Sequence, residues 1–163
     1  MSPEDVDPFA NATVEVFKTA LGCEIRYERA SLKQCHAPAF EVSGIISLTG
    51  KVHGAVVLSV SLPVAFKLVD AMLDLQVDEV NSDVTDAVGE LTNMIAGGAK
   101  TSLTHYQLSL GLPEVITGNS REIAYPESAQ PVCISFESEW GALAVEVGLV
   151  PHQQAEQPLC ARC

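Results

Sequence analysis

The sequence predicts an α/β fold of the α+β type, in which a mainly antiparallel sheet packs against two long helices. Three features carry this prediction: a helical pattern near the N-terminus, two β-branched runs joined by a short turn, and a longer helical pattern in the middle of the chain. The order of one helix, three strands, two helices and a final set of strands favours this arrangement over a parallel, doubly wound sheet.

The N-terminal part of the chain predicts a helix followed by a strand. Asp7 is suited to the N-cap and Pro8 to the first helical position, and apolar residues recur at helical spacing as far as Gly22, so the helix is expected over residues 8–21. Apolar and charged residues then alternate at the start of residues 23–32, which is typical of a strand with one solvent-facing side.

A β-hairpin is the next expectation. The apolar, β-branched runs at residues 40–48 and 52–60 are separated by Thr49, Gly50 and Lys51, which have the spacing and chemistry of a hairpin turn. These two runs form the most secure strand pair that the sequence predicts.

Two helices and a second group of strands are predicted after the hairpin. Ser61 is placed to cap the first helix, which ends in the acidic stretch at residues 74–83. The second, longer helix is expected to begin after Asn81 or Ser82 and to run to about Tyr106. Four strand-like segments follow, at residues 113–118, 122–125, 132–139 and 142–150.

Length and composition limit the organisation and the partners. A chain of 163 residues suits one domain, expected over residues 1–150, with a loose C-terminal tail at residues 151–163. The formal net charge of -12 makes nucleic acid and membrane surfaces poor partners and a basic partner a better one. The sequence shows neither a long apolar segment nor a basic leader, so a soluble cytoplasmic protein with reduced cysteines is expected.

The longest predicted helix has polar residues on one side that solubility alone does not require. At about 100° per residue, Asp86, Glu90, Asn93 and Gly97 fall within about 60° of one another. Gly97 and the adjacent Gly98 each cost a helix about 1 kcal/mol relative to alanine, and they would leave a bare patch for a partner. The apolar residues that define the buried side lie opposite: Val84, Val88, Leu91, Ile95 and Ala99. The alternative is an ordinary solvated helix face.

The segment Asp86–Gly97, DAVGELTNMIAG, resembles the E-x-x-N motif of the CheC/CheX chemotaxis phosphatases and is closest to CheX. Three other segments resemble that family in the same order, at residues 7–9, 42–50 and 112–118, so the resemblance covers about residues 5–150. One site is expected, because Glu15 on the first helix is followed three residues later by a lysine and not by asparagine.

The resemblance implies a CheC/CheX-like fold and hydrolysis of the aspartyl phosphate on a CheY-type response-regulator receiver domain. Glu90 would pair with the regulator's active-site lysine and Asn93 would orient the attacking water, while Asp86, Gly97 and Gly98 would contact the partner. No metal or cofactor is expected on this chain, since Mg²⁺ would be held by the regulator. The carboxamide of Asn93 suits this role because it donates hydrogen bonds to water and accepts them from water without repelling a phosphoryl group.

Two further expectations come from relatives of this kind. The first is a homodimer made by joining sheets, with residues 132–139 and 142–150 as the strands that could supply the edge. The second is the rival function, a non-catalytic receiver-binding or scaffold module like those of the flagellar switch. The intact pair of Glu90 and Asn93 favours the enzyme, because a scaffold has no need of it.

Other chemistries have less support. Residues 44–51 lack the Ser or Thr that a phosphate-binding loop needs after its lysine. The four histidines have no ligand spacing, and Cys160 and Cys163 lack the two further ligands of a zinc site.

Overall fold

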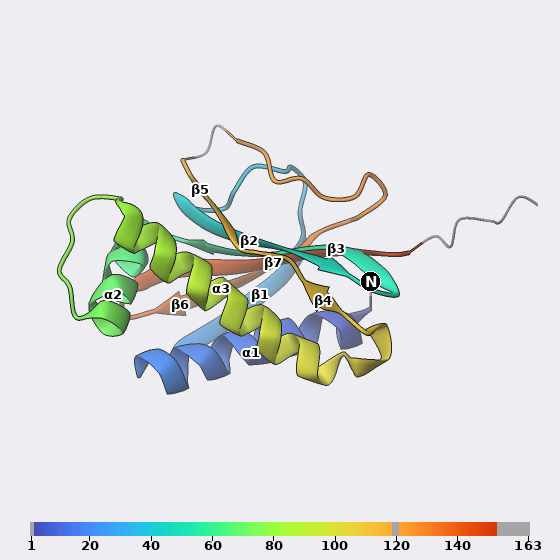
Figure 1. The fold of residues 1–163 in the computed structure, drawn as a ribbon, viewed down its shortest axis with the longest axis horizontal. Coiled ribbons are helices and arrows are strands. Elements are labelled where there is room, and N and C mark those ends of the chain that lie inside the picture. The colour runs from blue at the N-terminus through green and yellow to red at the C-terminus, as the bar shows by residue number, and fades with distance from the viewer. Residues whose placement is uncertain (1, 119–120, 153–163) are drawn as a thin grey trace, which may run out of the picture.

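Seven strands form one antiparallel sheet with the helices on one of its faces (Figure 1). The computed structural model describes residues 2–118 and 121–152. The strand order is β1-β6-β7-β3-β2-β4, and β5 also pairs with β2, which confirms the predicted fold class. The strands are β1 (Ile25–Leu32), β2 (Val42–Thr49), β3 (Val52–Val60), β4 (Ser109–Leu110), β5 (Glu114–Thr117), β6 (Val132–Ser138) and β7 (Gly141–Pro151). The helices are α1 (Pro3–Leu21), α2 (Leu62–Leu73) and α3 (Ser82–Ser102).

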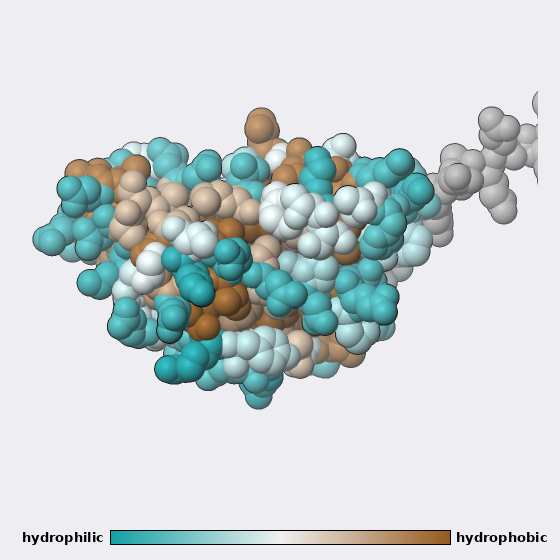
Figure 2. Space-filling view, turned by 90° about the horizontal axis from the view of Figure 1, so that it is seen from below, coloured by the Kyte–Doolittle hydropathy of each residue, from teal (hydrophilic) through white to brown (hydrophobic). Residues whose placement is uncertain are grey.

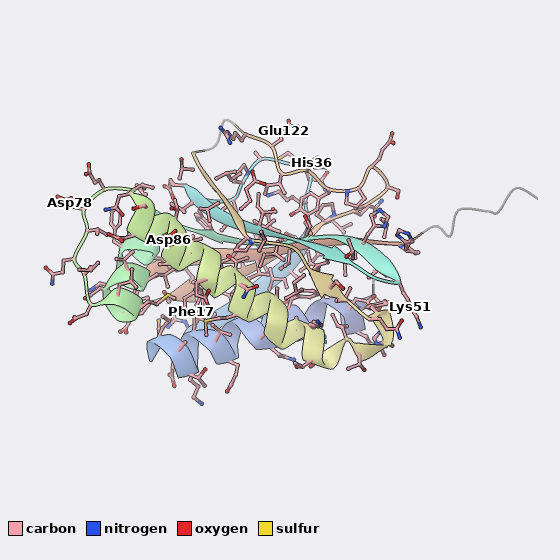
Figure 3. The ribbon with its side chains drawn as sticks, viewed as in Figure 1. Phe17, His36, Lys51, Asp78, Asp86 and Glu122 are labelled. Carbon is pink, nitrogen blue, oxygen red and sulfur yellow. The ribbon has the colours of Figure 1, made fainter. Side chains whose placement is uncertain are left out.

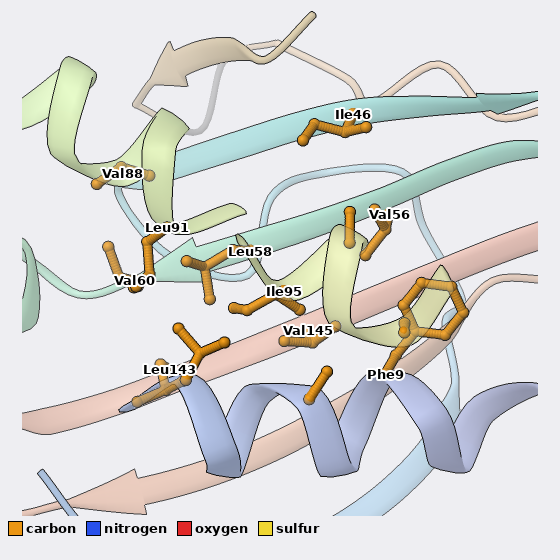
Figure 4. Close-up of a cluster of buried hydrophobic side chains, with 14 of the residues drawn as sticks. Phe9, Ile46, Val56, Leu58, Val60, Val88, Leu91, Ile95, Leu143 and Val145 are labelled. Atoms are coloured by element: carbon orange, nitrogen blue, oxygen red, sulfur yellow. The ribbon is translucent and has the colours of Figure 1, made fainter. Parts of the chain in front are cut away.

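The main hydrophobic core lies between the sheet and the helices. Val88, Leu91 and Ile95 of α3 are fully buried and point towards Leu58 of β3 and Val145 of β7 (Figure 4). They lie on the side of α3 that the periodicity predicts to be buried. The opposite side of this helix is therefore available to solvent.

The other face of the sheet is covered by the segments around residues 33–41 and 121–131, which lie above it in Figure 1. Beneath them Glu146 of β7 is completely buried and forms an ion pair with Lys33. Burial raises the pKa of the Glu146 carboxyl, and Lys33 opposes that rise. A Cβ on Gly148 would lie 2.6 Å from a ring carbon of Tyr125, so the glycine lets this ring pack directly on the sheet.

Helix α1 begins earlier than expected. Ser2 is its N-cap, and the Ser2 N–H donates to Asp5 Oδ2 at 2.9 Å, while Pro3 takes the first helical position. Pro8 lies inside the helix, so the prediction of a start at Asp7 and Pro8 is wrong. Ser2 with Pro3 and Asp7 with Pro8 are both residue pairs that favour the start of a helix. The helix begins at the earlier pair because the Tyr106 hydroxyl also donates to Asp5, at 2.6 Å.

The predicted strand at residues 122–125 is also wrong. The Ile123 N–H donates to His36 O at 2.8 Å, but the segment belongs to no strand. Ile123 is buried with Val57 and Ile116 on the second face of the sheet. Its apolar pattern therefore reflects packing under a loop and not pairing in the sheet.

β1 is one edge strand of the sheet, and the short strands β4 and β5 form the opposite edge. β6 lies between β1 and β7, and β7 lies between β6 and β3, so the expectation that these two segments supply an edge is wrong. Only Ile25 of β1 is buried, where alternate residues were expected.

The last strand ends at Pro151, close to the domain limit expected at residue 150. Most of the predicted tail, with Cys160 and Cys163, lies outside the described residues. None of the helices in the described part of the chain is both long and apolar enough to cross a membrane.

Candidate active site

The helix that carries the candidate residues starts where the sequence predicts. Asn81 is its N-cap, and its side-chain oxygen accepts a hydrogen bond from the Val84 N–H at 3.1 Å. The helix ends at Ser102, and a short 3₁₀ turn, Thr104–Tyr106, completes the segment that was expected to be helical. The cap satisfies one of the backbone N–H groups of the first turn and fixes where the helix begins.

Four residues on the outer side of α3 form what we term the α3 stripe: Asp86, Glu90, Asn93 and Gly97. The three polar residues are exposed and Gly97 is half-buried. Figure 3 shows Asp86 on the N-terminal half of the helix. Glu90 and Asn93 are about 4.5 Å apart along the helix axis and about 60° apart around it, so both side chains reach the same outside region.

The Glu90 carboxylate and the Asn93 amide are not engaged elsewhere. Within residues 2–118 and 121–152, neither side chain makes a hydrogen bond or an ion pair. A carboxylate and an amide that stay free in the isolated chain remain available for groups on a partner.

A close contact with the sheet sets the rotation of α3. Thr92 is fully buried beside Asn93, and its hydroxyl donates to Val88 O at 2.7 Å. A Cβ on Gly44 of β2 would lie only 2.1 Å from the Thr92 hydroxyl oxygen. The glycine therefore lets α3 sit directly on β2, and this seat holds Glu90 and Asn93 outwards.

The connection between β4 and β5 borders one side of the α3 stripe. Gly89 is buried, and a Cβ there would lie 3.6 Å from Pro113 Cβ and 3.4 Å from Val115 Cγ2. Leu112, just before this proline, is 93% exposed. An apolar side chain therefore stands next to the polar ones at this border.

The two glycines near the end of the stripe have different surroundings. A Cβ on Gly97 would meet no atom within 4 Å, so packing gives no reason for glycine there. A Cβ on Gly98 would lie 3.2 Å from Ala12 Cβ in α1. The absence of a side chain at Gly98 therefore lets α1 approach α3, while the residue itself is exposed and its place on the partner surface stays a prediction.

The candidate site is an acidic ridge and not a pocket. Asp83, Asp86 and Glu90 give the first half of α3 three carboxylates. Hollows of the described surface lie elsewhere, with volumes of about 530 Å³ beside Gln107, about 510 Å³ beside His53 and about 400 Å³ beside Trp140. Figure 2 views the helical side and shows hydrophilic residues around a smaller hydrophobic centre. A ridge of this kind acts on a group that another macromolecule presents to it.

In the part of the chain that the structure describes, His, Cys, Asp and Glu side chains form no group of three or more that could hold a metal ion. Cys23, Cys35 and Cys133 are free thiols. The α3 stripe itself offers two carboxylates and one amide.

Sequence reasoning missed the residues that surround the stripe. Gly44, Thr92 and Pro113 position or border it, and Leu112 stands beside it. A glycine inside a predicted strand was the available signal for Gly44, because such a glycine often marks a close approach of another segment. The position of Leu112 depends on long-range pairing with β2, and no local pattern reports that.

Known proteins resemble this chain in sequence and in fold. Residues 42–137 match the family model described as chemotaxis phosphatase CheX. The CheY-P phosphatase CheX of Thermotoga maritima is 25% identical over 126 residues, which covers 76% of this chain and 81% of that protein. The crystal structure of a CheC-like superfamily protein from Shewanella sp. PV-4 is 28% identical, with a TM-score of 0.82 over 92% of this chain and 99% of that one. The fold also matches that of a chain in the crystal structure of the CheX–CheY–BeF3–Mg²⁺ complex from Borrelia burgdorferi. The two chains are 21% identical, with a TM-score of 0.73 over 88% of this chain and 96% of that one.

Proposed function

The chain belongs to the chemotaxis phosphatase CheX family, and we propose that it hydrolyses the aspartyl phosphate of a CheY-type receiver domain. The relative from Thermotoga maritima is named a CheY-P phosphatase, and a structural neighbour is a CheX–CheY complex, which supports this choice of substrate. The reaction ends the signal that the phosphorylated receiver carries.

In the proposed mechanism Asn93 orients the attacking water. Its amide oxygen accepts a hydrogen from the water, and its neutral charge avoids repelling the phosphoryl group. The water oxygen attacks phosphorus in line, the bond between phosphorus and the aspartyl oxygen breaks, and the products are inorganic phosphate and the free carboxylate. Mg²⁺ would be held by the receiver, where it offsets the negative charge of the phosphoryl group.

Glu90 docks the receiver in this mechanism. Its carboxylate would pair with a lysine of the receiver's active site, one helical turn from the position of Asn93. Asp86 would add to the attraction for a basic surface, and Gly97 would let the receiver backbone come close.

One observation carries the proposal: an exposed, unengaged Glu90 and Asn93 project side by side from a helix whose other side is seated firmly on the sheet. Because the helix is fixed by the core, the pair is held in place before the receiver arrives. Such preorganisation favours catalysis by positioning.

The function is tested by the decay of phosphorylated receivers. Receiver domains from the same genome are phosphorylated with acetyl phosphate in the presence of Mg²⁺, the acetyl phosphate is removed, and the loss of phosphate is followed with and without the chain. We expect the chain to shorten the phosphate lifetime of at least one receiver. Saturable binding with an unchanged lifetime would instead identify the scaffold function.

We also propose that two copies join through β1, an edge strand of the sheet. The Lys33 N–H donates to Pro131 O on the β6 side at 2.8 Å. Because N–H directions alternate along a strand, the Ala30 and Leu32 N–H groups face the free edge. Such an edge invites pairing with another strand, and a second β1 is the partner that gives a symmetric dimer.

Ala30→Pro is expected to shift the chain from dimer to monomer. It removes an edge-facing N–H and places a proline ring at the junction, while the bonds of β1 to β6 stay. Sedimentation velocity measures the change, and Ala30→Ser, which keeps the N–H, is the matched control. A wild-type chain that remains monomeric at high concentration would contradict the dimer. The expected cytoplasmic location stays a prediction.

A further inference from the structure

Leu112 is the most exposed of the large hydrophobic side chains in the described residues. Its exposed fraction is 93%, against 57% for Tyr27 and for Leu32. A single exposed leucine is common on protein surfaces, so its setting has to decide whether it has a function.

The backbone around Leu112 is held at both ends by the same strand. Leu110 of β4 pairs with Leu48 of β2, and Glu114 of β5 pairs with Ile45. Between these pairs, the Gly111 N–H donates to Ser47 O at 2.8 Å. Only three residues connect β4 to β5, so the backbone at Leu112 is fixed and has little freedom to lose on binding.

Leu112 stands on the Asn93 side of the α3 stripe. Pro113 packs over Gly89, the residue just before Glu90. At about 100° per residue, Asp86 and Asn93 lie between the directions of Gly89 and Glu90 around the helix. A partner that reaches these two side chains therefore also meets the tip of the connection between β4 and β5.

We propose that Leu112 is the apolar anchor of the receiver-docking surface, an inference that rests on the proposed function. The acidic stripe selects a basic partner, but exposed ion pairs contribute little affinity by themselves. Interfaces gain most of their affinity from a few side chains that are buried in well-packed, water-free pockets of the partner. Leu112 is the side chain next to the stripe that offers this chemistry, and it would bury against an apolar patch beside the receiver's phosphorylation site.

The test is a comparison of KM and kcat. With the receiver whose phosphate lifetime the chain shortens most, Leu112→Ala is expected to raise KM about 10-fold and to leave kcat within about twofold, because the leucine touches no reacting atom. Leu73→Ala, an exposed leucine of α2 outside both the α3 stripe and β1, is the matched control and should leave KM unchanged. An unchanged KM for Leu112→Ala would overturn the inference. So would a variant that changes the oligomeric state of the chain and leaves KM unchanged.

A binding titration separates this inference from the proposed function. The probe is each receiver from the same genome, loaded with beryllofluoride and Mg²⁺, which is not hydrolysed. Weaker binding by Leu112→Ala together with no acceleration by the wild type would support the docking surface and overturn the phosphatase. Absence of binding by the wild type would overturn both.

Discussion

Replacing Asn93 with alanine is expected to lower receiver-phosphate hydrolysis by about 100-fold or more, because the attacking water loses the group that orients it. The variant should unfold like the wild type, since Asn93 is exposed and makes no hydrogen bond within the described residues. The measurement is the phosphate lifetime of the receiver under saturating chain. Asn11→Ala, the same change at an exposed position of α1, is the matched control and should keep full activity.

Glu90→Gln provides a contrast to Asn93→Ala. It removes the charge that would meet the receiver's lysine while it keeps the shape of the side chain, so we expect KM to rise and the salt dependence of KM to weaken. If Asn93→Ala keeps the wild-type acceleration, the role of Asn93 is wrong. If both variants raise only KM, the pair docks the receiver and another group orients the water.

Lys33→Met is expected to destabilise the fold by about 3–5 kcal/mol at pH 8, because it leaves the Glu146 charge buried without a partner. Glu146 is completely inaccessible and Lys33 has only 9% of its side chain exposed, so water replaces little of the lost attraction. Urea unfolding, monitored by circular dichroism, measures the loss.

The effect of Lys33→Met depends on pH with a defined sign. Burial raises the pKa of Glu146 in the folded chain above its value of about 4.3 in an unfolded chain. The folded state therefore holds the proton more tightly, and the contribution of Glu146 to stability is greatest below about pH 4.3 and falls as pH rises through the raised pKa. Without Lys33 the rise in pKa is larger, so the destabilisation should be smaller at pH 5 than at pH 8.

A double variant serves as the control for the buried pair. Lys33→Met with Glu146→Met replaces both charges by apolar groups and should recover most of the lost stability. Equal unfolding midpoints for Lys33→Met and the wild type at pH 8 would contradict the role of the pair.

The parts of the fold that the sequence predicts well are those with a strong local pattern. The apolar positions of α3, its cap at Asn81 and the hairpin of β2 and β3 are all present. The same local periodicity gave the outward direction of Glu90 and Asn93, because a helix turns by a fixed angle per residue whatever packs against it.

The rest depends on contacts between distant segments. Residues 132–139 look like any apolar strand, and only their pairing with β1 and β7 places them inside the sheet. Ile123 has the alternation of a strand but is buried under a loop. The bond from Tyr106 to Asp5 spans about a hundred residues and favours the earlier start of α1. None of these contacts leaves a signal at one place in the sequence.

The seat of Thr92 on Gly44 separates two duties of one helix: the inner side keeps the protein folded and the outer side meets the receiver. A variant that lacks Asn93 still has Glu90 and Leu112, so it should bind a phosphorylated receiver without hydrolysing its aspartyl phosphate. Such a chain would be a substrate trap. Immobilised, it would retain the phosphorylated form of its own regulator longer than the wild type does, and that difference would single out the regulator among the many receivers of one cell.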